Sequence, residues 1–415
     1  MHCPGGHRFQ TSGPGKYPPG PFPGRAPRCP EAPPGSTPPV PGCRRVQSAA
    51  ISRSLYSSPI CYFCGVKIQE KYMLRCIQIG RNALGRSAPN PMVGALLTHG
   101  DTIIGSGYTS AFGGPHAEVN AIRSVADPGK LPDSTLYVTL EPCCHHGKTP
   151  PCTDRIIESG IRRVVVGLPD PHDKVAGQGI AQLREAGCQV EVGVAADACR
   201  EHHKRFLTLH EKGRPYIVLK WAQSPDGFLA PDPEVRGEST GPWWITGRES
   251  RQLVHKWRTQ ESAILVGWRT AAADDPQLTS RDWAGKDPLR VLLDPSGRAP
   301  EGLRLLDGKV PTLRVLHTGQ QPTGSARVEN IFLEPGPGFL RALCRELRER
   351  GVLSILVEGG AHTLGSFLSA GLWDEARVFT GPRPLNGGLR APALSGRLVA
   401  NTASGADTLT LWRND

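Results

Sequence analysis

The chain has 415 residues, of which 38% are apolar and 21% charged, and its formal net charge is +11. A domain takes about 100–200 residues, so this length predicts two or three domains. No uninterrupted apolar run approaches the roughly 18 residues of a membrane-spanning helix, which excludes a spanning protein.

Residues 1–67 differ in composition from the rest of the chain. Positions 1–65 hold 14 of the 40 prolines and show no hydrophobic periodicity. Such a stretch cannot bury enough apolar surface to offset its ordering entropy. We therefore expect a disordered, basic extension, with a transit peptide or a partner-binding arm as the alternative.

Most of the positive charge belongs to this extension. Up to residue 68, eight Lys/Arg face one acid, which accounts for +7 of the +11 and leaves +4 for the body. We expect no nucleic-acid partner, because so small an excess gives the body no evident polyanion-binding face.

Twelve cysteines without a secretory signal indicate reduced thiols, metal ligands or passive core residues. We expect a cytoplasmic location, with organellar targeting by the extension as the alternative. The Cys61–Cys64 pair lacks a second half and is a weak zinc-knuckle or redox signal.

Helices and strands alternate from Ile68 to about residue 195. The expected elements are a helix at Lys71–Ile79, strands at Val93–Leu97 and Thr102–Gly107, a helix from His116, a strand at Thr135–Leu140, a helix from Thr153, a strand at Arg163–Gly167, a helix at Gly179–Ala186 and a strand at Gln189–Val194. This alternation predicts an α/β domain over residues 68–195.

A connecting helix is expected over residues 196–214, with His202 and His203 on its surface. A second α/β domain follows over residues 215–415. Its expected elements are strands at 215–221, Ala263–Val266, Arg290–Leu293, Thr312–Leu316 and Leu353–Val357, and helices at Ser250–Arg258 and Gly338–Arg350.

The first half carries the strongest chemical motif, His116-Ala-Glu118 followed by Glu-Pro-Cys143 and, nine positions later, Cys152. Zinc deaminases combine an H-x-E element with a later pair of cysteines. One imidazole and two thiolates leave the fourth zinc position open for water, whose pKa the metal lowers. In this interpretation Glu118 moves the water proton to the ring nitrogen and the departing amine.

The alternative is an ordinary helix start with inert core cysteines. The loop around Cys143 is dense in Gly, Pro, Cys and His, which favours zinc. Cys144, His145 and His146 are competing ligands, and we prefer Cys143 and Cys152 because each can lie near the end of a helix or strand.

Several segments resemble the bifunctional riboflavin-biosynthesis deaminase/reductase family. HAEVNAI, EPCCHHGKTPPC, APNPMVGALL and DPHDKVAGQG are similar to its deaminase half. PYIVLKWAQSPDGFLA, WWITGRESR, DDPQLTSR and LVEGGAHTLGSFL are similar to its reductase half. The resemblance implies a cytidine-deaminase-like three-layer α/β/α domain, followed by a dihydrofolate-reductase-like α/β domain.

In the deaminase half, the resemblance implies hydrolysis of the 2-amino group of 2,5-diamino-6-(5-phosphoribosylamino)pyrimidin-4(3H)-one. The matching positions make His116, Cys143 and Cys152 zinc ligands and Glu118 the proton shuttle, with substrate contacts at Asn90, Lys148 and Asp170. Two positions depart from the family pattern, Thr109 in place of a His and His172 in place of an Asn.

In the reductase half, the resemblance implies NADPH-dependent reduction of the ribosyl group to ribityl, giving 5-amino-6-(5-phosphoribitylamino)uracil. Lys220 and Glu358 match polar positions near the substrate, and charges in apolar runs are costly unless paired. Other substrate positions are Arg258, Leu278 and Arg281. The guanidinium groups of the two arginines suit a phosphate.

The expected cofactor positions in this half include Gly359 and Gly360, whose backbone amides lie between a strand and a helix and could hold a pyrophosphate. The remaining cofactor matches are Gln223, Trp244, Thr270 and Asp274, whereas Pro295 replaces a common polar contact.

The sequence therefore predicts a bifunctional enzyme, a homo-oligomer with a phosphorylated pyrimidine as its substrate, that uses one zinc ion in each deaminase domain and NADPH. One alternative is an enzyme with a single active half. The other is a nucleic-acid-binding or base-editing protein that uses the basic extension.

Overall fold

The computed structural model describes residues 68–414, apart from 148, 173–174, 238–240 and 322–326. The proline-rich extension, the Cys61–Cys64 pair and the expectations that rest on them lie outside the described residues. All described residues belong to the same structural unit, Ile60–Asp415. Across the described ranges, no helix combines the length and apolar character that a membrane crossing requires.

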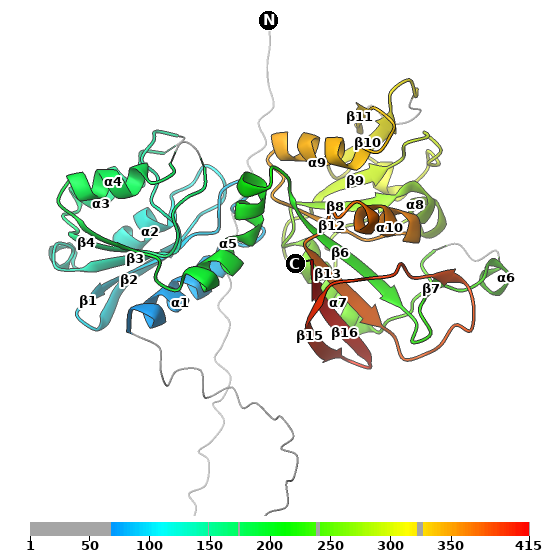
Figure 1. Ribbon diagram of the computed structural model, residues 1–415, viewed down its shortest axis with the longest axis horizontal. Helices are drawn as coiled ribbons and strands as arrows, with labels where there is room; N and C mark the ends of the chain where they lie inside the picture. The colour runs from blue at the N-terminus through cyan, green and yellow to red at the C-terminus, as the bar shows by residue number, and fades with distance from the viewer. Residues whose placement is uncertain (1–67, 148, 173–174, 238–240, 322–326, 415) are drawn as a thin grey trace, which may run out of the picture. The chain divides into compact units, whose positions relative to one another are not determined.

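The first half builds a five-stranded sheet in the order β2-β1-β3-β4-β5 (Figure 1). Its strands are β1 (Gly94–His99), β2 (Thr102–Tyr108), β3 (Thr135–Val138), β4 (Arg163–Val166) and β5 (Gln189–Val192). β1 is antiparallel to β2 and β3, and β3, β4 and β5 are parallel. The short turn between β1 and β2 allows only a hairpin, whereas each parallel pair needs a helical crossover.

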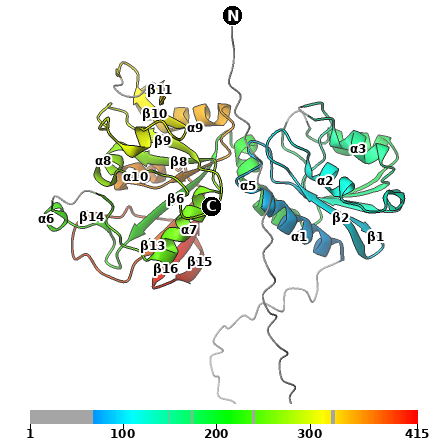
Figure 2. The ribbon, with the colours of Figure 1, turned by 180° about the vertical axis from the view of Figure 1, so that it is seen from behind.

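Helices cover both faces of this sheet (Figures 1 and 2). One face carries α1 (Ile68–Gly80) and α5 (Ala196–Glu211), and the other carries α2 (Ala117–Arg123), α3 (Cys152–Glu158) and α4 (Gln178–Glu185). Between them lies a core that includes Met73, Leu96 and Leu136, all fully buried. The expected three-layer α/β/α arrangement is confirmed.

The second half builds a nine-stranded sheet in the order β11-β10-β9-β8-β12-β6-β13-β16-β15. The first seven strands in this order, from β11 at the edge to β13, are parallel to one another. β16 is antiparallel to β13, and β15 is antiparallel to β16. The bounds are β6 (Tyr216–Gln223), β8 (Ala263–Gly267), β9 (Leu289–Leu293), β10 (Thr312–His317), β11 (Glu329–Leu333), β12 (Ser354–Val357), β13 (Glu375–Thr380), β15 (Arg397–Ser404) and β16 (Asp407–Arg413).

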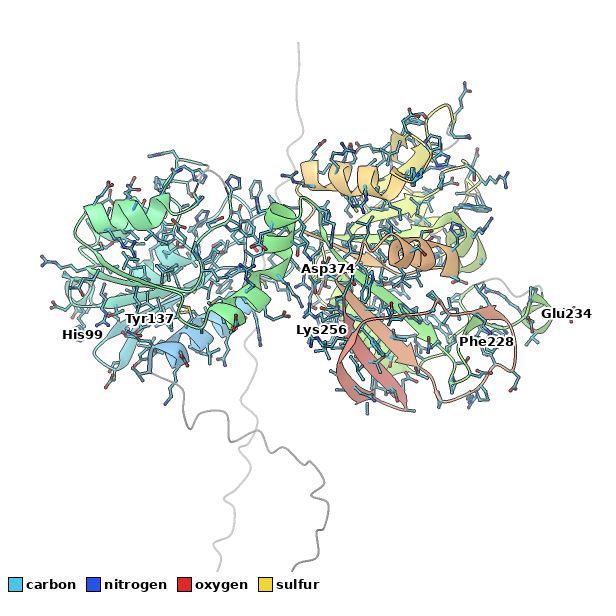
Figure 3. All side chains as sticks on the ribbon, in the orientation of Figure 1. His99, Tyr137, Phe228, Glu234, Lys256 and Asp374 are labelled. Carbon is cyan, nitrogen blue, oxygen red and sulfur yellow. The ribbon has the colours of Figure 1, made fainter. Side chains whose placement is uncertain are left out.

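The expected second α/β domain is confirmed, and it contains further short elements. Its helices are α6 (Pro233–Arg236), α7 (Arg248–Arg258), α8 (Trp268–Asp274), α9 (Phe339–Glu349) and α10 (Ala361–Ser369), and β7 (Phe228–Ala230) pairs with β14 (Leu389–Arg390). The described residues of the two halves also contain three 3-10 turns, η1 (Arg81–Ala83), η2 (Pro128–Lys130) and η3 (Arg304–Leu306). Asp374, labelled in Figure 3, joins β13 to β6 by accepting the Ile217 N–H at 2.9 Å.

The expectation that His202 and His203 lie on the surface of the connecting helix is wrong. Both side chains are buried, because α5 packs against α1 and the first sheet. His202 Nε2 lies 2.7 Å from the Met92 carbonyl oxygen, and His203 Nε2 lies 2.9 Å from Thr139 Oγ1. Burial lowers the pKa of His202 to about 4, so this imidazole is neutral and fills the helix–sheet interface.

Candidate active sites

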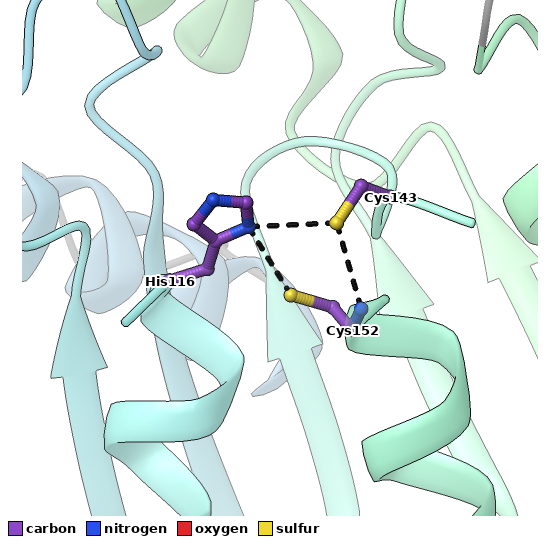
Figure 4. Close-up of side chains that lie close together, drawn as sticks. All are labelled: His116, Cys143 and Cys152. Carbon is purple, nitrogen blue, oxygen red and sulfur yellow. Dashed lines mark hydrogen bonds between the residues drawn. The ribbon is translucent and has the colours of Figure 1, made fainter. Parts of the chain in front are cut away.

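Three side chains from separate segments of the first half converge on one point (Figure 4). His116 Nδ1 lies 3.4 Å from Cys143 Sγ and 3.3 Å from Cys152 Sγ, and all three donor atoms lie within 4.8 Å of one another. A nitrogen and two sulfurs are the donors that zinc prefers. The donor set therefore fits a zinc ion.

Local backbone structure explains this convergence. His116 is the N-cap residue of α2, and Cys152 is the first residue of α3, directly after Pro151. A first-turn N–H has no partner within its own helix. The Cys152 N–H instead points to Cys143 Sγ, with 3.5 Å between the nitrogen and the sulfur.

The two thiols share their protons unequally. The hydrogen bond from Cys152 lowers the pKa of Cys143 to about 4, and the same bond, with burial, raises the pKa of Cys152. One sulfur is thus ready to bind a cation, and the second must lose its proton on binding.

Glu118 lies in the first turn of α2, two residues after His116, and is buried. Burial raises its pKa to about 7, helped by the Cys143 sulfur and opposed by His116. A carboxyl group with a pKa near neutrality can both accept and return a proton. The competing ligands lie elsewhere: His145 and His146 are exposed, and Cys144 Sγ lies 4.0 Å from Gln178 Oε1.

The other predicted deaminase residues have different surroundings. Asn90 lines a separate cavity of about 50 Å³ beside His202 and His203, and Lys148 lies outside the described residues. Asp170 is buried, and its Oδ1 accepts the His172 N–H at 2.8 Å. Thr109, at the position where the family often has a His, accepts the Val93 N–H at 3.1 Å.

The second half contains a pocket of about 1150 Å³ at the carboxyl ends of its parallel strands. Lys220 on β6, Trp268 after β8, Pro295 after β9 and Glu358 after β12 all line it. Open α/β sheets bind ligands at this edge, because the loops that follow neighbouring strands meet there.

A buried charge cluster forms one wall of this pocket. Arg258 Nε and Nη2 donate to the two oxygens of Glu358 at 2.9 and 2.8 Å, and Lys220 Nζ lies 3.8 Å from Glu358 Oε2. Burial alone would raise the pKa of Glu358, but Arg258 and Lys220 lower it to about 2. The predicted charges are therefore paired, and the guanidinium fork of Arg258 is occupied by protein.

Five of the six expected cofactor residues line this pocket, and the sixth, Gln223, does not. Trp244, Thr270, Asp274, Gly359 and Gly360 line the pocket. A side chain at Gly360 would put its Cβ 2.6 Å from Thr270 Oγ1, so backbone alone fits here, directly before α10. This cradle suits a pyrophosphate and fits NADPH.

Gln223 stands apart from that group. Its Oε1 accepts the Trp221 indole N–H at 2.8 Å, and it is not among the described residues that line the pocket.

Leu278 and Arg281 lie in the pocket wall, as the substrate match implied. His255, one turn before Arg258 on α7, also lines the pocket, and its Nε2 lies 3.2 Å from Asp282 Oδ2. Sequence reasoning missed His255. The spacing of Arg251, His255 and Arg258 on one helix face was the available signal.

Fold and sites together define a zinc-type deaminase domain joined to an α/β reductase domain. The sequence pattern of the cytidine and deoxycytidylate deaminase zinc-binding region matches residues 66–168, and that of the RibD C-terminal domain matches residues 215–403.

Whole-chain comparisons agree with this class. The riboflavin biosynthesis protein RibD of Aquifex aeolicus is 40% identical over 326 residues, covering 78% of this chain and 89% of its own length. The RibD of Escherichia coli is 35% identical over 337 residues, covering 77% of this chain and 89% of its own length.

Among solved structures, a diaminohydroxyphosphoribosylaminopyrimidine deaminase/5-amino-6-(5-phosphoribosylamino)uracil reductase from Thermotoga maritima has a TM-score of 0.75 at 35% identity, covering 83% of this chain and 98% of its own. Acinetobacter baumannii RibD has a TM-score of 0.74 at 32% identity with the same coverages. The chain belongs to the RibD family of riboflavin biosynthesis proteins, and it is a bifunctional, zinc-dependent deaminase and NADPH-dependent reductase.

Proposed function

We propose that this chain hydrolyses the 2-amino group of 2,5-diamino-6-(5-phosphoribosylamino)pyrimidin-4(3H)-one and then reduces the ribosyl side chain, giving 5-amino-6-(5-phosphoribitylamino)uracil. The observation that carries the proposal is the convergence of His116, Cys143 and Cys152 beside the buried Glu118. The Thermotoga maritima relative, whose name describes this pair of reactions, supports the choice of substrate.

In the deaminase site, His116, Cys143 and Cys152 would hold the zinc ion, which supplies Lewis-acid activation of water. Glu118 would take a proton from the water as its oxygen adds to ring carbon 2 and deliver that proton to the adjacent ring nitrogen. It would then move the remaining hydroxyl proton to the amino nitrogen, so that the C2 carbonyl forms as the bond from C2 to nitrogen breaks and ammonia departs. Burial of Glu118 suits both roles, because it brings the pKa to about 7.

When bound in the reductase site, NADPH would supply a hydride to the ribosyl C1, whose bond to the ring oxygen breaks. Gly359, Gly360, Thr270 and Asp274 would hold the cofactor, and Trp244 and Gln223 are further contacts that the family match implies. Lys220, whose pKa burial lowers, would give a proton to that ring oxygen, and Glu358 holds the Lys220 ammonium group in place.

Substrate binding uses residues from both halves of the chain. We assign Asn90, Lys148 and Asp170 to the deaminase site. Arg258, Leu278, Arg281 and Glu358 belong to the reductase site.

We further propose domain limits of 68–195 and 215–415, joined by residues 196–214, with residues 1–67 as an extension. A cytoplasmic location fits a site that needs two reduced sulfurs, which an oxidising compartment would not maintain. A homo-oligomer fits Leu398 and Val399, both about half-exposed on the edge strand β15.

The decisive experiment incubates zinc-loaded protein with the diaminopyrimidine phosphate, with and without NADPH. Ammonia release should need no NADPH, and loss of NADPH absorbance should follow only when the deaminated product is present. Ammonia without NADPH oxidation would show a single active half, and neither signal would refute the proposal. Salt-dependent RNA or DNA binding that survives deletion of residues 1–65 would favour the nucleic-acid alternative.

A further inference from the structure

Among the described residues that line the reductase pocket, six are arginines. Four of them are engaged within the protein: Arg236 with Asp274 at 2.8 Å, Arg251 with the Thr246 carbonyl at 3.1 Å, Arg258 with Glu358 at 2.8 Å and Arg304 with Asp275 at 2.9 Å. Arg269 and Arg281 are exposed and have no carboxylate or carbonyl partner in the described part of the chain. The pocket therefore offers two uncommitted guanidinium groups.

These two arginines belong to different parts of the pocket wall. Arg281 directly precedes Asp282, the partner of His255 at 3.2 Å, so it lies on the side of the pocket that holds α7. Burial lowers the pKa of His255, and the Arg258 and Arg281 charges lower it further. Arg269 follows β8 and directly precedes Thr270, whose hydroxyl faces Gly360. The Gly267 N–H, two residues before Arg269, donates to the Gly359 carbonyl at 3.0 Å. Arg269 thus lies in the first turn of α8, which adjoins the Gly359–Gly360 cradle.

The charge balance of helix α8 favours an anion. Helix α8 and its C-cap residue carry two carboxylates, Asp274 and Asp275, and arginines from other segments neutralise both. Dinucleotide sites that prefer NAD place a carboxylate on the ribose 2′-hydroxyl, whereas an arginine accommodates the 2′-phosphate of NADP. Here the surplus charge is the Arg269 guanidinium, 5.4 Å from the centre of the Trp268 ring, and a stacked guanidinium keeps its N–H edge free for oxygen.

We propose that Arg269 binds the 2′-phosphate of NADPH and makes this reductase prefer NADPH to NADH. The inference rests on the proposed placement of the cofactor at Gly359 and Gly360. Of the two uncommitted guanidinium groups, that of Arg281 then binds the substrate phosphate, and that of Arg269 binds the 2′-phosphate of the cofactor.

The test uses the full-length chain and measures binding by calorimetry. The probes are adenosine 2′,5′-bisphosphate and adenosine 5′-monophosphate, which differ only in the 2′-phosphate. Arg269→Gln should weaken bisphosphate binding about 10- to 100-fold, the range expected for a lost charged hydrogen bond, and change monophosphate binding less than about twofold. Arg269→Lys should recover part of the bisphosphate affinity. Arg345→Gln, on the exposed face of α9, removes the same charge outside the pocket and should change neither affinity.

Three results would overturn the inference. The first is that the wild-type chain binds the two nucleotides with equal affinity. The second is that Arg269→Gln loses the same affinity for both nucleotides, and the third is that it loses affinity for neither. If NADPH itself binds the wild-type chain while Arg269→Gln has no effect, the cofactor assignment stands and only the role of Arg269 fails. If NADPH does not bind the wild-type chain, the cofactor assignment and the role of Arg269 both fail.

Discussion

The Cys152 sulfur is buried at the first turn of α3, whereas the Cys144 sulfur, eight residues earlier, faces Gln178. We expect Cys152→Ser to lose zinc and ammonia release together, because a serine hydroxyl is a poor substitute for a thiolate ligand. Cys144→Ser is the matched control and should retain both. Metal analysis of the purified variants decides the question, and one zinc per Cys152→Ser chain would contradict the ligand assignment.

Glu118 has a different role from the three donors beside it. Glu118→Gln keeps the size of the side chain but cannot exchange a proton, so we expect zinc to remain and turnover to fall about 10²- to 10⁴-fold. Zinc content and initial rates of ammonia release measure the two effects separately. A variant that keeps wild-type turnover would remove Glu118 from the mechanism.

The zinc donors are predictable from sequence because each lies in a short segment whose residue types are rare together. The pairing of Arg258 with Glu358 is not predictable from the sequence. The two residues are 100 positions apart, and only the fold brings the end of α7 close to the end of β12. For the same reason His255 and its partner Asp282 gave no signal beyond helix spacing.

At the scale of elements, Glu141 organises the loop that leads into α4. Its buried carboxylate accepts the N–H groups of Asp170 at 3.0 Å, Gly177 at 3.0 Å and Ile180 at 3.1 Å. The approach is tight, because a Cβ on Gly179 would lie 2.1 Å from the Pro142 carbonyl oxygen. Glu141 thus fixes where Asp170 stands relative to the segment that carries Cys143.

We expect Glu141→Gln to displace this loop, because an amide NH₂ would face backbone donors. The free energy of unfolding should fall by about 1–3 kcal/mol, the cost of unsatisfied buried groups. Zinc content should persist, and KM for the diaminopyrimidine should rise more than kcat falls. The same substitution at the exposed Glu185 on α4 controls for charge. An unchanged KM would show that the loop does not position the substrate.

Most of the helices and strands were predictable, because long apolar runs and helical periodicity mark them. The expected elements of the second half did not include strands β7, β11, β13, β14, β15 and β16 or helices α6, α8 and α10. β15 has no buried residue and lies at the sheet edge, so the alternation that marks a half-buried strand is missing. The burial of His202 and His203 was also missed, because helix periodicity does not show that a second layer will cover that face.

At the scale of the whole molecule, α5 is tied to the second sheet by buried charges. Arg205 Nε and Nη2 donate to the two oxygens of Glu261 at 2.8 and 2.5 Å, and Arg377 Nη2 lies 3.5 Å from the same carboxylate. Lys204 Nζ lies 3.0 Å from Glu375 on β13. Removing one partner of a buried ion pair leaves an uncompensated charge, so these contacts specify how α5 packs on the sheet.

This network predicts how stability depends on pH. Burial opposes ionisation of Glu261, but Arg205 and Arg377 outweigh it and lower the pKa from 4.5 to about 2. A carboxyl group with a depressed folded-state pKa contributes stability above its unfolded pKa, and that contribution is lost as pH falls through the folded one. The free energy of unfolding should therefore fall between about pH 4.5 and 2, with a contribution from Glu261 on the order of 3 kcal/mol.

Urea unfolding at a series of pH values measures this loss, and Glu261→Gln isolates its source. The variant should be less stable than wild type at neutral pH, because Arg205 loses its charged partner, and its stability should fall less steeply below pH 4.5. Glu349→Gln, exposed on α9, should keep the wild-type slope. If Glu261→Gln kept that slope as well, the acid sensitivity would arise from other carboxylates, and the contact between α5 and the second sheet would owe little to this ion pair.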